Sequence, residues 1–282
     1  MNKFKKFIHK SIRLNRLISL ISFYAEHLDY IRKPYPNRLS VKNLVELKTS
    51  DKIYILGSGA SLNDISGVDW ENIAFNDSFA LNRWYKSTAL NRWYKLNFHP
   101  TLWMMEPMRD DKLRVEENNE LQEFMDHAKS FKILKNWQAL YKYYPYEVAK
   151  SLAFKFDRVV MMRRVHIYSH KQMLQLDKYI SSKHFHFYRG SLFLAICMAK
   201  LAGYKKIILC GVDLSGGYFW EVKPENFKRV HNTALDKYGV SMKDALLALK
   251  SALLKDGVVL YSHETCRFDL SSESSQKINP DI

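Results

Sequence analysis

Cysteine is scarce in this sequence, with three residues among 282. Cys197 and Cys210 lie inside apolar runs, where thiols act as small core residues, and Cys266 makes the count odd, so we expect no disulfide framework. The sequence has no Cys-x-x-Cys, no His-Glu-x-x-His and no Asp-x-Asp, which argues against the common zinc and magnesium sites. No secretory signal is evident either. We therefore expect a chain without a resident metal in a reducing, cytoplasmic environment.

Long hydrophobic runs are also absent, because no stretch of about 18 apolar residues occurs that could cross a membrane. Acidic residues are missing before Glu26, whereas the formal net charge of the whole chain is +15. The basic residues of this first stretch alternate with apolar ones and are Lys3, Lys5, Lys6, Lys10, Arg13 and Arg16. Such a pattern is typical of a helix that lies in a membrane interface, but a basic helix packed on the domain would show it too.

The strong positive charge implies an anionic partner, which could be nucleic acid, an anionic membrane surface or a phosphorylated substrate. We expect no nucleic-acid partner, because the sequence has no zinc finger, no RNP-type motif and no helix-turn-helix signature. We predict that residues 1–38 form a basic amphipathic segment and a proline-containing linker. This segment would make peripheral contact with the anionic inner face of the cytoplasmic membrane.

Hydrophobic residues make up 47% of the chain and aromatic residues 14%, which argues against disorder. Apolar segments alternate with helical patterns, as in βαβ units. The predicted strands are Lys52–Leu56, Ile73–Asn76, Thr101–Met105, Phe131–Leu134, Val159–Met162, Lys206–Cys210 and Val258–Tyr261. The clearest predicted helices are Glu116–Lys129, Ser191–Leu201 and Met242–Lys255, with glycine stops at Gly203 and Gly257 after the last two. We predict an α/β domain over residues 39–270, with a mainly parallel sheet, and a polar tail over 271–282.

The segment after the first predicted strand has the composition of a phosphate-binding loop. Gly57 and Gly59 permit a sharp turn and keep side chains away from a ligand. Ser61, with Asp64 three residues later, suits the N-cap of a helix, whose first-turn amides would face an anion at the sheet edge. Leu62 replaces the third glycine of the dinucleotide fingerprint, and a tight turn without a ligand is the alternative.

Polar residues follow several predicted strands at their carboxyl ends, where open parallel sheets bind ligands. They include Asn76, Glu106, Asp213 and His263. Asn76 lies 17 residues beyond Gly59, at a spacing from which a side chain can reach a nucleotide ribose, although it could equally cap the next turn. These residues define the edge at which we predict the site.

One internal repeat lies between the predicted strands. The heptapeptide Ala80–Lys86 recurs as Ala89–Lys95. Two copies are too few for a solenoid, so we interpret them as a local tandem duplication that lengthens one helical or looped connection.

Four segments together, Ile55–Ile65, Ala74–Asp77, Arg189–Ile196 and Gly203–Asp213, resemble bacterial CMP-sugar-dependent glycosyltransferases of lipopolysaccharide and lipooligosaccharide synthesis. The pattern is similar to both the sialyltransferases and the core Kdo transferases of this group. The resemblance implies a Rossmann-like sheet with helices on both faces and a lid before the last helix, about 214–240. It also implies a metal-independent reaction without a cofactor, in which the CMP-activated sugar is the donor.

The resemblance implies roles for individual residues. Donor-binding residues would be Gly57, Ser58, Gly59, Ser61, Asn76, Arg189, Gly190, Ser191 and Asp213. A lid histidine is the family's base, so His231 is the candidate here and His263 the reserve, although His231 could equally be a surface residue. Tyr218 would donate a hydrogen bond to the leaving phosphate or anchor the lid. The sialyltransferases have Asn where Ser58 stands, and two tyrosines where only Tyr218 is available, which leaves the donor sugar open.

We therefore predict an enzyme that transfers an ulosonic acid, Kdo or sialic acid, from CMP to a lipopolysaccharide or lipooligosaccharide acceptor. One alternative is a phosphate-transferring enzyme of a neighbouring Rossmann-like family, which would need magnesium and acidic ligands. The other is a non-catalytic basic protein that binds nucleic acid or membrane, with salt-dependent binding and no response to nucleotides.

Overall fold

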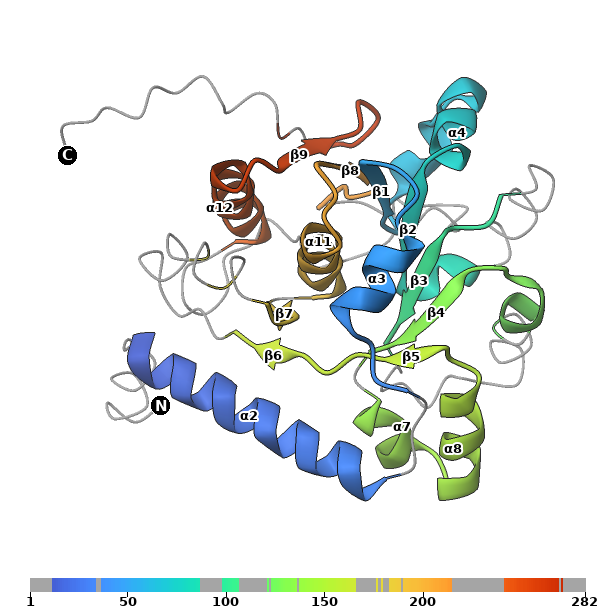
Figure 1. The fold of residues 1–282 in the computed structure, drawn as a ribbon. Coiled ribbons are helices and arrows are strands. Elements are labelled where there is room, and N and C mark those ends of the chain that lie inside the picture. Colours follow the sequence, from blue (N-terminus) through green and yellow to red (C-terminus); the bar gives the residue numbers. More distant parts are fainter. Residues whose placement is uncertain are drawn as a thin grey trace.

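A central sheet of seven strands, all paired in parallel in the order β5-β4-β3-β2-β1-β8-β9, dominates the computed structural model (Figure 1). The strands are β1 (Lys52–Leu56), β2 (Asp77–Leu81), β3 (Leu102–Met105), β4 (Phe131–Leu134), β5 (Arg158–Val159), β8 (Lys206–Cys210) and β9 (Val259–Ser262). The structure describes residues 12–33, 37–86, 98–106, 121, 123–135, 137–165, 176, 179, 183–188, 190–214, 241–268 and 270. The predicted α/β class with a mainly parallel sheet is confirmed.

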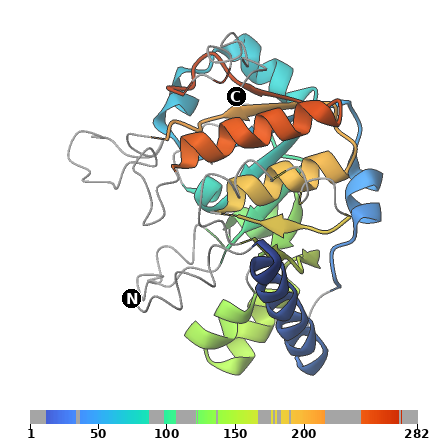
Figure 2. The same cartoon turned by 90° about the vertical axis from the view of Figure 1, so that its left-hand side faces the viewer.

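Helices cover both faces of this sheet. The helical elements are α2 (Ile12–Arg32), α3 (Val41–Leu47), η1 (Ala60–Asp64), α4 (Gly67–Ala74), η2 (Asn82–Tyr85), α7 (Gln138–Tyr143), α8 (Tyr146–Phe154), α11 (Ser191–Leu201) and α12 (Met242–Lys255). Figure 2 shows α11 and α12 side by side along one face. Their buried side chains share a core cluster with those of α3, while α4 and α8 contribute to a second cluster on the other face.

The side chains of β1 explain how the two cores form. Ile53 and Ile55 belong to the cluster under α11 and α12, whereas Tyr54 and Leu56 belong to the opposite one. Successive strand residues point to opposite faces, so a continuous apolar strand supplies both cores at once. β1 pairs with β2 on one side and with β8 on the other. The chain therefore reverses its winding direction at β1, and in open α/β sheets ligands bind at such a switch point.

A second, small sheet lies beside the carboxyl edge of the main one and was not predicted. β6 (Arg163–Arg164) pairs in parallel with β7 (His186–Phe187). β6 follows shortly after the carboxyl end of β5, and β7 shortly precedes α11. The long helix α2 packs on β6, where Arg164 Nε lies 3.4 Å from Glu26 Oε1. This sheet therefore joins α2 to the edge at which parallel strands end.

The bounds of β1, β4, β8, α11 and α12 are those predicted, β3 begins one residue later than predicted, and β9 is shifted by one residue at both ends. Gly203 and Gly257 have positive φ angles of 88° and 71° after their helices, so the predicted stops are confirmed. In the predicted helix 116–129, the structure describes residues 121 and 123–129, of which 121 and 123–127 are helical.

The strand predicted at Ile73–Asn76 is wrong. Ser66 Oγ caps α4 by accepting from Asp69 N, and Trp70 and Ile73 are buried one helical turn apart, so these residues continue a helix. The strand begins one residue after Asn76. The strand predicted at Val159–Met162 is also shifted, because β5 ends at Val159.

The predicted lid lies outside the described residues except for Leu214, and so do residues 1–11 and the tail. The domain boundaries at 38 and 270 therefore stay predictions.

Candidate functional site

The glycine loop after β1 is joined to the end of β8. Gly57 N donates to Cys210 O over 2.8 Å, and Gly59 N donates to Gly211 O over the same distance. A Cβ atom added at Gly57 would overlap Gly211 O, and one at Gly59 would overlap the Asp213 carboxylate. The two glycines are therefore required by the close approach of these segments, a reason different from the ligand clearance that we predicted.

The Asp213 carboxylate occupies the start of the helix that follows this loop. It accepts from Ser61 N over 2.9 Å, from the Ser61 hydroxyl, and from Arg267 N over 3.4 Å. The helix is the five-residue 3-10 helix η1, and its N-cap is Gly59, which has no side chain of its own to cap it. The prediction that Ser61 is an N-cap whose turn presents a row of free amides is wrong, because Asp213 takes up the Ser61 amide. Asp213 and Ser61 are buried and shape the loop.

Two backbone N–H groups of the loop are available as hydrogen-bond donors to a ligand. Within the described part of the chain, the N–H groups of Ser58 and Ala60 make no hydrogen bond, and both residues are half-buried. The loop therefore offers two backbone donors at the switch point, fewer than the sequence predicted.

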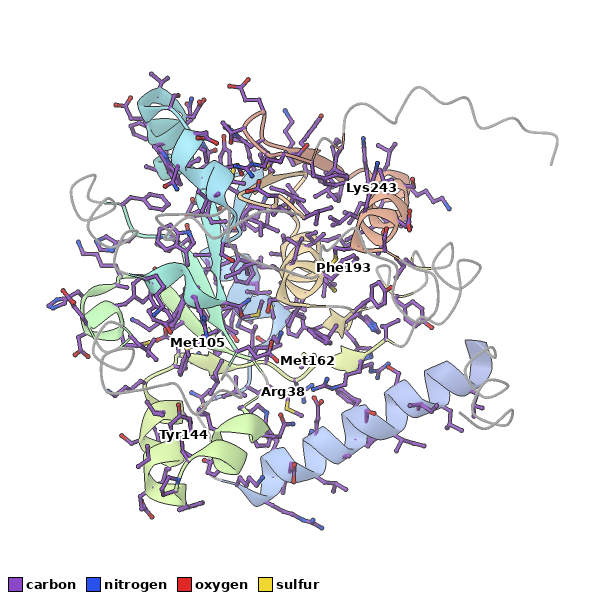
Figure 3. All side chains as sticks on the ribbon, turned by 180° about the vertical axis from the view of Figure 1, so that it is seen from behind. Arg38, Met105, Tyr144, Met162, Phe193 and Lys243 are labelled. Atoms are coloured by element: carbon purple, nitrogen blue, oxygen red, sulfur yellow. The ribbon has the colours of Figure 1, made fainter. Side chains whose placement is uncertain are left out.

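A polar network lies at the carboxyl ends of β2, β3 and β4, against the first residue of α11. Lys135 Nζ lies 2.6 Å from Glu106 Oε2 and 2.9 Å from Ser191 Oγ. Ser191 Oγ in turn donates to Asn82 Oδ1 over 3.1 Å. In Figure 3 the network lies near two labelled residues, Met105, which ends β3 directly before Glu106, and Phe193, in the first turn of α11.

Asn82 occupies the place that we predicted for Asn76. It follows directly after β2, with a positive φ of 53°, and its carbonyl accepts from Trp103 Nε1 over 3.0 Å. Asn76 precedes β2 instead and lies at the opposite, amino edge, where its Nδ2 donates to Asn72 O over 2.7 Å. The prediction that Asn76 ends the second strand at the carboxyl edge is therefore wrong, and its predicted role toward a donor depended on that placement.

Lys135 is the electrostatic centre of the network. Its side chain is fully buried, whereas the Glu106 side chain is 37% exposed. Burial lowers the pKa of Lys135, and the charge and hydrogen bond of Glu106 act in the opposite direction. The ammonium also lies 4.4 Å from the centre of the Phe187 ring. Glu106, Ser191 and the ring face thus surround the buried charge on three sides.

The network has a fixed hydrogen-bond direction. An ammonium can only donate, so Ser191 Oγ accepts from Lys135 and uses its own proton toward Asn82 Oδ1. The Asn82 amide is therefore oriented with its oxygen toward Ser191, which leaves the Nδ2 group, a donor, on its other side.

The start of α11 adds positive potential to this place. Its N-cap is Gly190, which has φ of 150° and ψ of 179°, and no side chain caps the helix. A Cβ atom added at Gly190 would meet no atom of the described residues within 4 Å, so none of these residues fills the space beside it. An eleven-residue helix that begins at such a space, next to a buried ammonium, favours a negatively charged group there.

The reserve base, His263, lies apart from this network. It follows β9 at the rim of the sheet, where Nδ1 is 3.0 Å from Thr265 Oγ1. β9 is three strands from β2, about 14 Å at the usual strand spacing. His231, Tyr218 and Arg189 lie outside the described residues, so their roles stay predictions.

A groove of about 760 Å³ lies at the opposite edge of the sheet, lined by residues that include His99, Lys129 and Lys132. Polar groups at this edge also stabilise the fold, because the buried Asp77 accepts from Thr49, Ser50 and Tyr204. We place the candidate site at the carboxyl edge, which the backbone donors, the helix start and Lys135 share.

Across the described ranges, no group of three His, Cys, Asp or Glu side chains is arranged to hold a metal ion. None of the helices searched there combines the length and the apolar character needed to cross a bilayer.

No protein-family model matches the chain, and no curated protein matches it. Among solved structures, it is similar to the monofunctional α-2,3-sialyltransferase Cst-I from Campylobacter jejuni, with 18% identity, a TM-score of 0.44 and 79% of each chain covered. It is also similar to the sialyltransferase CstII from Campylobacter jejuni, solved with cytidine-5'-monophosphate, with 16% identity, a TM-score of 0.38, and 78% of this chain and 81% of that one covered.

A third similar structure is the MAf glycosyltransferase from Magnetospirillum magneticum, with 13% identity and a TM-score of 0.41, where 83% of this chain matches 35% of that one.

Proposed function

We propose that the chain is a glycosyltransferase that moves an ulosonic acid, Kdo or sialic acid, from a CMP-activated donor to a hydroxyl group of a lipopolysaccharide or lipooligosaccharide. The observation that carries this proposal is the Asn82–Ser191–Lys135–Glu106 network at the start of α11. A CMP-ulosonic acid bears a phosphate and a carboxylate, and the helix start and the buried ammonium supply the opposite potential. The order of the sequence motifs supports the same class.

In this proposal the donor lies along the carboxyl edge between the glycine loop and α11. The amides of Ser58 and Ala60 and the start of α11 at Gly190 and Ser191 donate to the phosphate. Asn82 donates through Nδ2 to the nucleotide or the sugar. Asp213 and Ser61 hold the loop in shape and do not contact the donor.

The reaction exchanges one bond for another at the anomeric carbon. The acceptor hydroxyl oxygen attacks this carbon, the bond to the CMP phosphate breaks, and CMP leaves with the electron pair. A base takes the acceptor proton, and we assign this step to His231, with His263 in reserve. Tyr218 and Arg189 would stabilise the departing phosphate by hydrogen bonds. We propose that hydrogen bonds and the helix potential stabilise this charge without a metal.

A thermal-shift experiment tests the proposal. CMP, CMP-sialic acid and CMP-Kdo should raise the melting temperature, since a ligand at 100 times its Kd stabilises a protein by about 2.7 kcal/mol. Ser191→Ala should reduce the shift, because it removes the link between Lys135 and Asn82. Ser251→Ala is a matched control, since Ser251 is an exposed serine that donates only to its own helix at Leu247 O.

Stabilisation by UDP-glucose alone would contradict the proposal. Stabilisation by ATP with magnesium, and by no cytidine nucleotide, would favour a phosphate-transferring enzyme instead.

A further inference from the structure

Helix α2 carries a row of exposed apolar side chains along one face. These are Leu17 (50% exposed), Ile21 (59%), Tyr24 (55%), Leu28 (53%) and Ile31 (66%), which we call the α2 stripe. Their spacing of alternately four and three residues keeps them on one side of the helix, over about 21 Å from first to last. A continuous exposed apolar row of this length marks an interaction surface.

The opposite face of α2 is already occupied by the protein. Ser19 is buried, Glu26 pairs with Arg164, and the Phe23 ring lies under the Arg163 guanidinium at 4.8 Å. Asp29 Oδ2 lies 4.0 Å from Lys33 Nζ. Both acidic side chains of the helix therefore have a basic neighbour. Figure 1 shows α2 along the border of the molecule, next to β6.

The neighbours of the α2 stripe indicate which partner it fits. A second copy of the helix, paired as a coiled coil, favours a narrow apolar seam flanked by complementary charges. The flanking residues here include Ile18, Leu20 and Ala25, which widen the apolar face. A wide apolar face that contains a tyrosine suits the interface of a bilayer, where the ring contacts the acyl chains and its hydroxyl contacts the headgroups and water.

The basic residues before α2 and in its first turns favour a bilayer with anionic lipids. Lys3, Lys5, Lys6 and Lys10 precede the helix, Arg13 and Arg16 belong to its first turns, and no acidic residue occurs before Glu26. Each basic residue near an anionic lipid surface contributes about 1 kcal/mol of attraction. Apolar burial and lipid charge would thus act together at this end of the chain.

Helix α2 lies beside the polar network, which it approaches through the face opposite to the α2 stripe. Glu26 of α2 pairs with Arg164, whose guanidinium lies 5.5 Å from the centre of the Phe187 ring. The Lys135 ammonium lies 4.4 Å from the centre of the same ring. Three contacts therefore connect the helix to the polar network.

We propose that the α2 stripe docks the chain on an anionic lipid bilayer and so holds the donor site beside an acceptor embedded in that bilayer. The docking surface stands on the structure of α2, and its role in presenting the acceptor rests on the proposed function. Binding should depend on both the stripe and lipid charge, and it should weaken as salt rises.

Sedimentation of the full chain with vesicles tests this proposal. One set of vesicles mixes phosphatidylglycerol with phosphatidylcholine, and the other contains phosphatidylcholine alone. The stripe variant is Ile21→Glu with Leu28→Glu. The matched control is Val68→Glu with Leu254→Glu, which adds the same charge at apolar positions 68% and 59% exposed on α4 and α12. Circular dichroism checks that each variant is folded.

The wild type and the control should bind the anionic vesicles, whereas the stripe variant should bind them at least about tenfold more weakly. Equal binding by the stripe variant and the control would overturn the proposal. The proposal would also be overturned if the wild type did not bind vesicles and eluted as a dimer while the stripe variant eluted as a monomer. That result would show that the stripe binds a second copy of the chain.

The thermal shift with CMP separates this proposal from the proposed function. The stripe variant should respond to CMP like the wild type, because the stripe is exposed and the contact between α2 and the network runs through Glu26 on the other face of the helix. Stripe-dependent vesicle binding without any response to CMP would support the docking surface and refute the transferase.

Discussion

The ion pair between Lys135 and Glu106 should respond very differently to the loss of each partner. Glu106→Leu leaves an ammonium that is 0% exposed without its counter-ion, and breaking a buried pair in this way costs about 3–5 kcal/mol. Lys135→Met leaves a carboxylate that is 37% exposed and retains water, while the methionine fills the buried space. We expect it to cost about 1 kcal/mol or less. The double variant should resemble Lys135→Met.

The pH dependence of this difference has a definite sign. Burial lowers the pKa of Lys135 from its ordinary value of 10.5, and Glu106→Leu removes the two influences that raise it. Between the folded pKa and 10.5 the unfolded chain binds more protons than the folded one, so stability rises with pH. The deficit of Glu106→Leu relative to the wild type should therefore shrink between the folded Lys135 pKa of the variant and that of the wild type, by up to about 1.36 kcal/mol per pH unit, and stay constant above it.

Urea denaturation of the wild type, both single variants and the double variant, at several pH values from neutral to alkaline, measures these free energies. Equal destabilisation by Lys135→Met and Glu106→Leu would refute the reasoning. So would a Glu106→Leu deficit that does not change with pH, because the cost would then not come from a buried charge.

Three further perturbations have defined outcomes. Gly59→Ala should destabilise the fold and weaken CMP binding, because its Cβ would overlap the Asp213 carboxylate. Urea denaturation measures the stability and calorimetry the CMP affinity. Unchanged stability and affinity would contradict the packing argument. Burial, with the charges of Arg163 and His184, lowers the pKa of His186 from 6.5 to about 4, so unfolded chains bind more protons in this window. His186 alone should cost the wild type up to about 3 kcal/mol on acidification through this window, and His186→Phe should remove that contribution to the slope in urea titrations at each pH. His231→Ala should lower turnover by at least about 10²-fold, whereas an unchanged rate would move the base to His263.

The sheet could be predicted largely from the sequence, because β1, β4 and β8 are short runs rich in apolar residues and bounded by glycine or serine residues. The second strand could not, since Ile73 and its neighbours form an apolar run too short to distinguish a strand from a helix end. Trp70 and Ile73 are three residues apart, as on one face of a helix, and this spacing was the signal in the sequence that could have indicated a helix here.

The site was predicted only in part. Ser191 and the glycine loop follow local rules, and Glu106 was recognised at a strand end. Lys135 was missed because a lysine is usually exposed, and its burial depends on partners from β3 and α11 that are distant in sequence. Asn82 was missed because it belongs to the duplicated heptapeptide, which we interpreted as a connection, although its first copy begins in β2.

Ser61 and Asp213 show a second limit of local patterns. Each is a polar residue at a strand end or a helix start, and each alone suggests a contact with a ligand. They are 152 positions apart and satisfy one another, which only the pairing of β1 with β8 brings about.

A crystal structure of the chain with CMP tests the central claim most directly, because it shows where the nucleotide phosphate binds. We predict the phosphate at Gly190 and Ser191, with an Asn82 Nδ2 hydrogen bond to the nucleotide. CMP bound instead in the groove at the amino edge, near His99 and Lys132, would contradict this account.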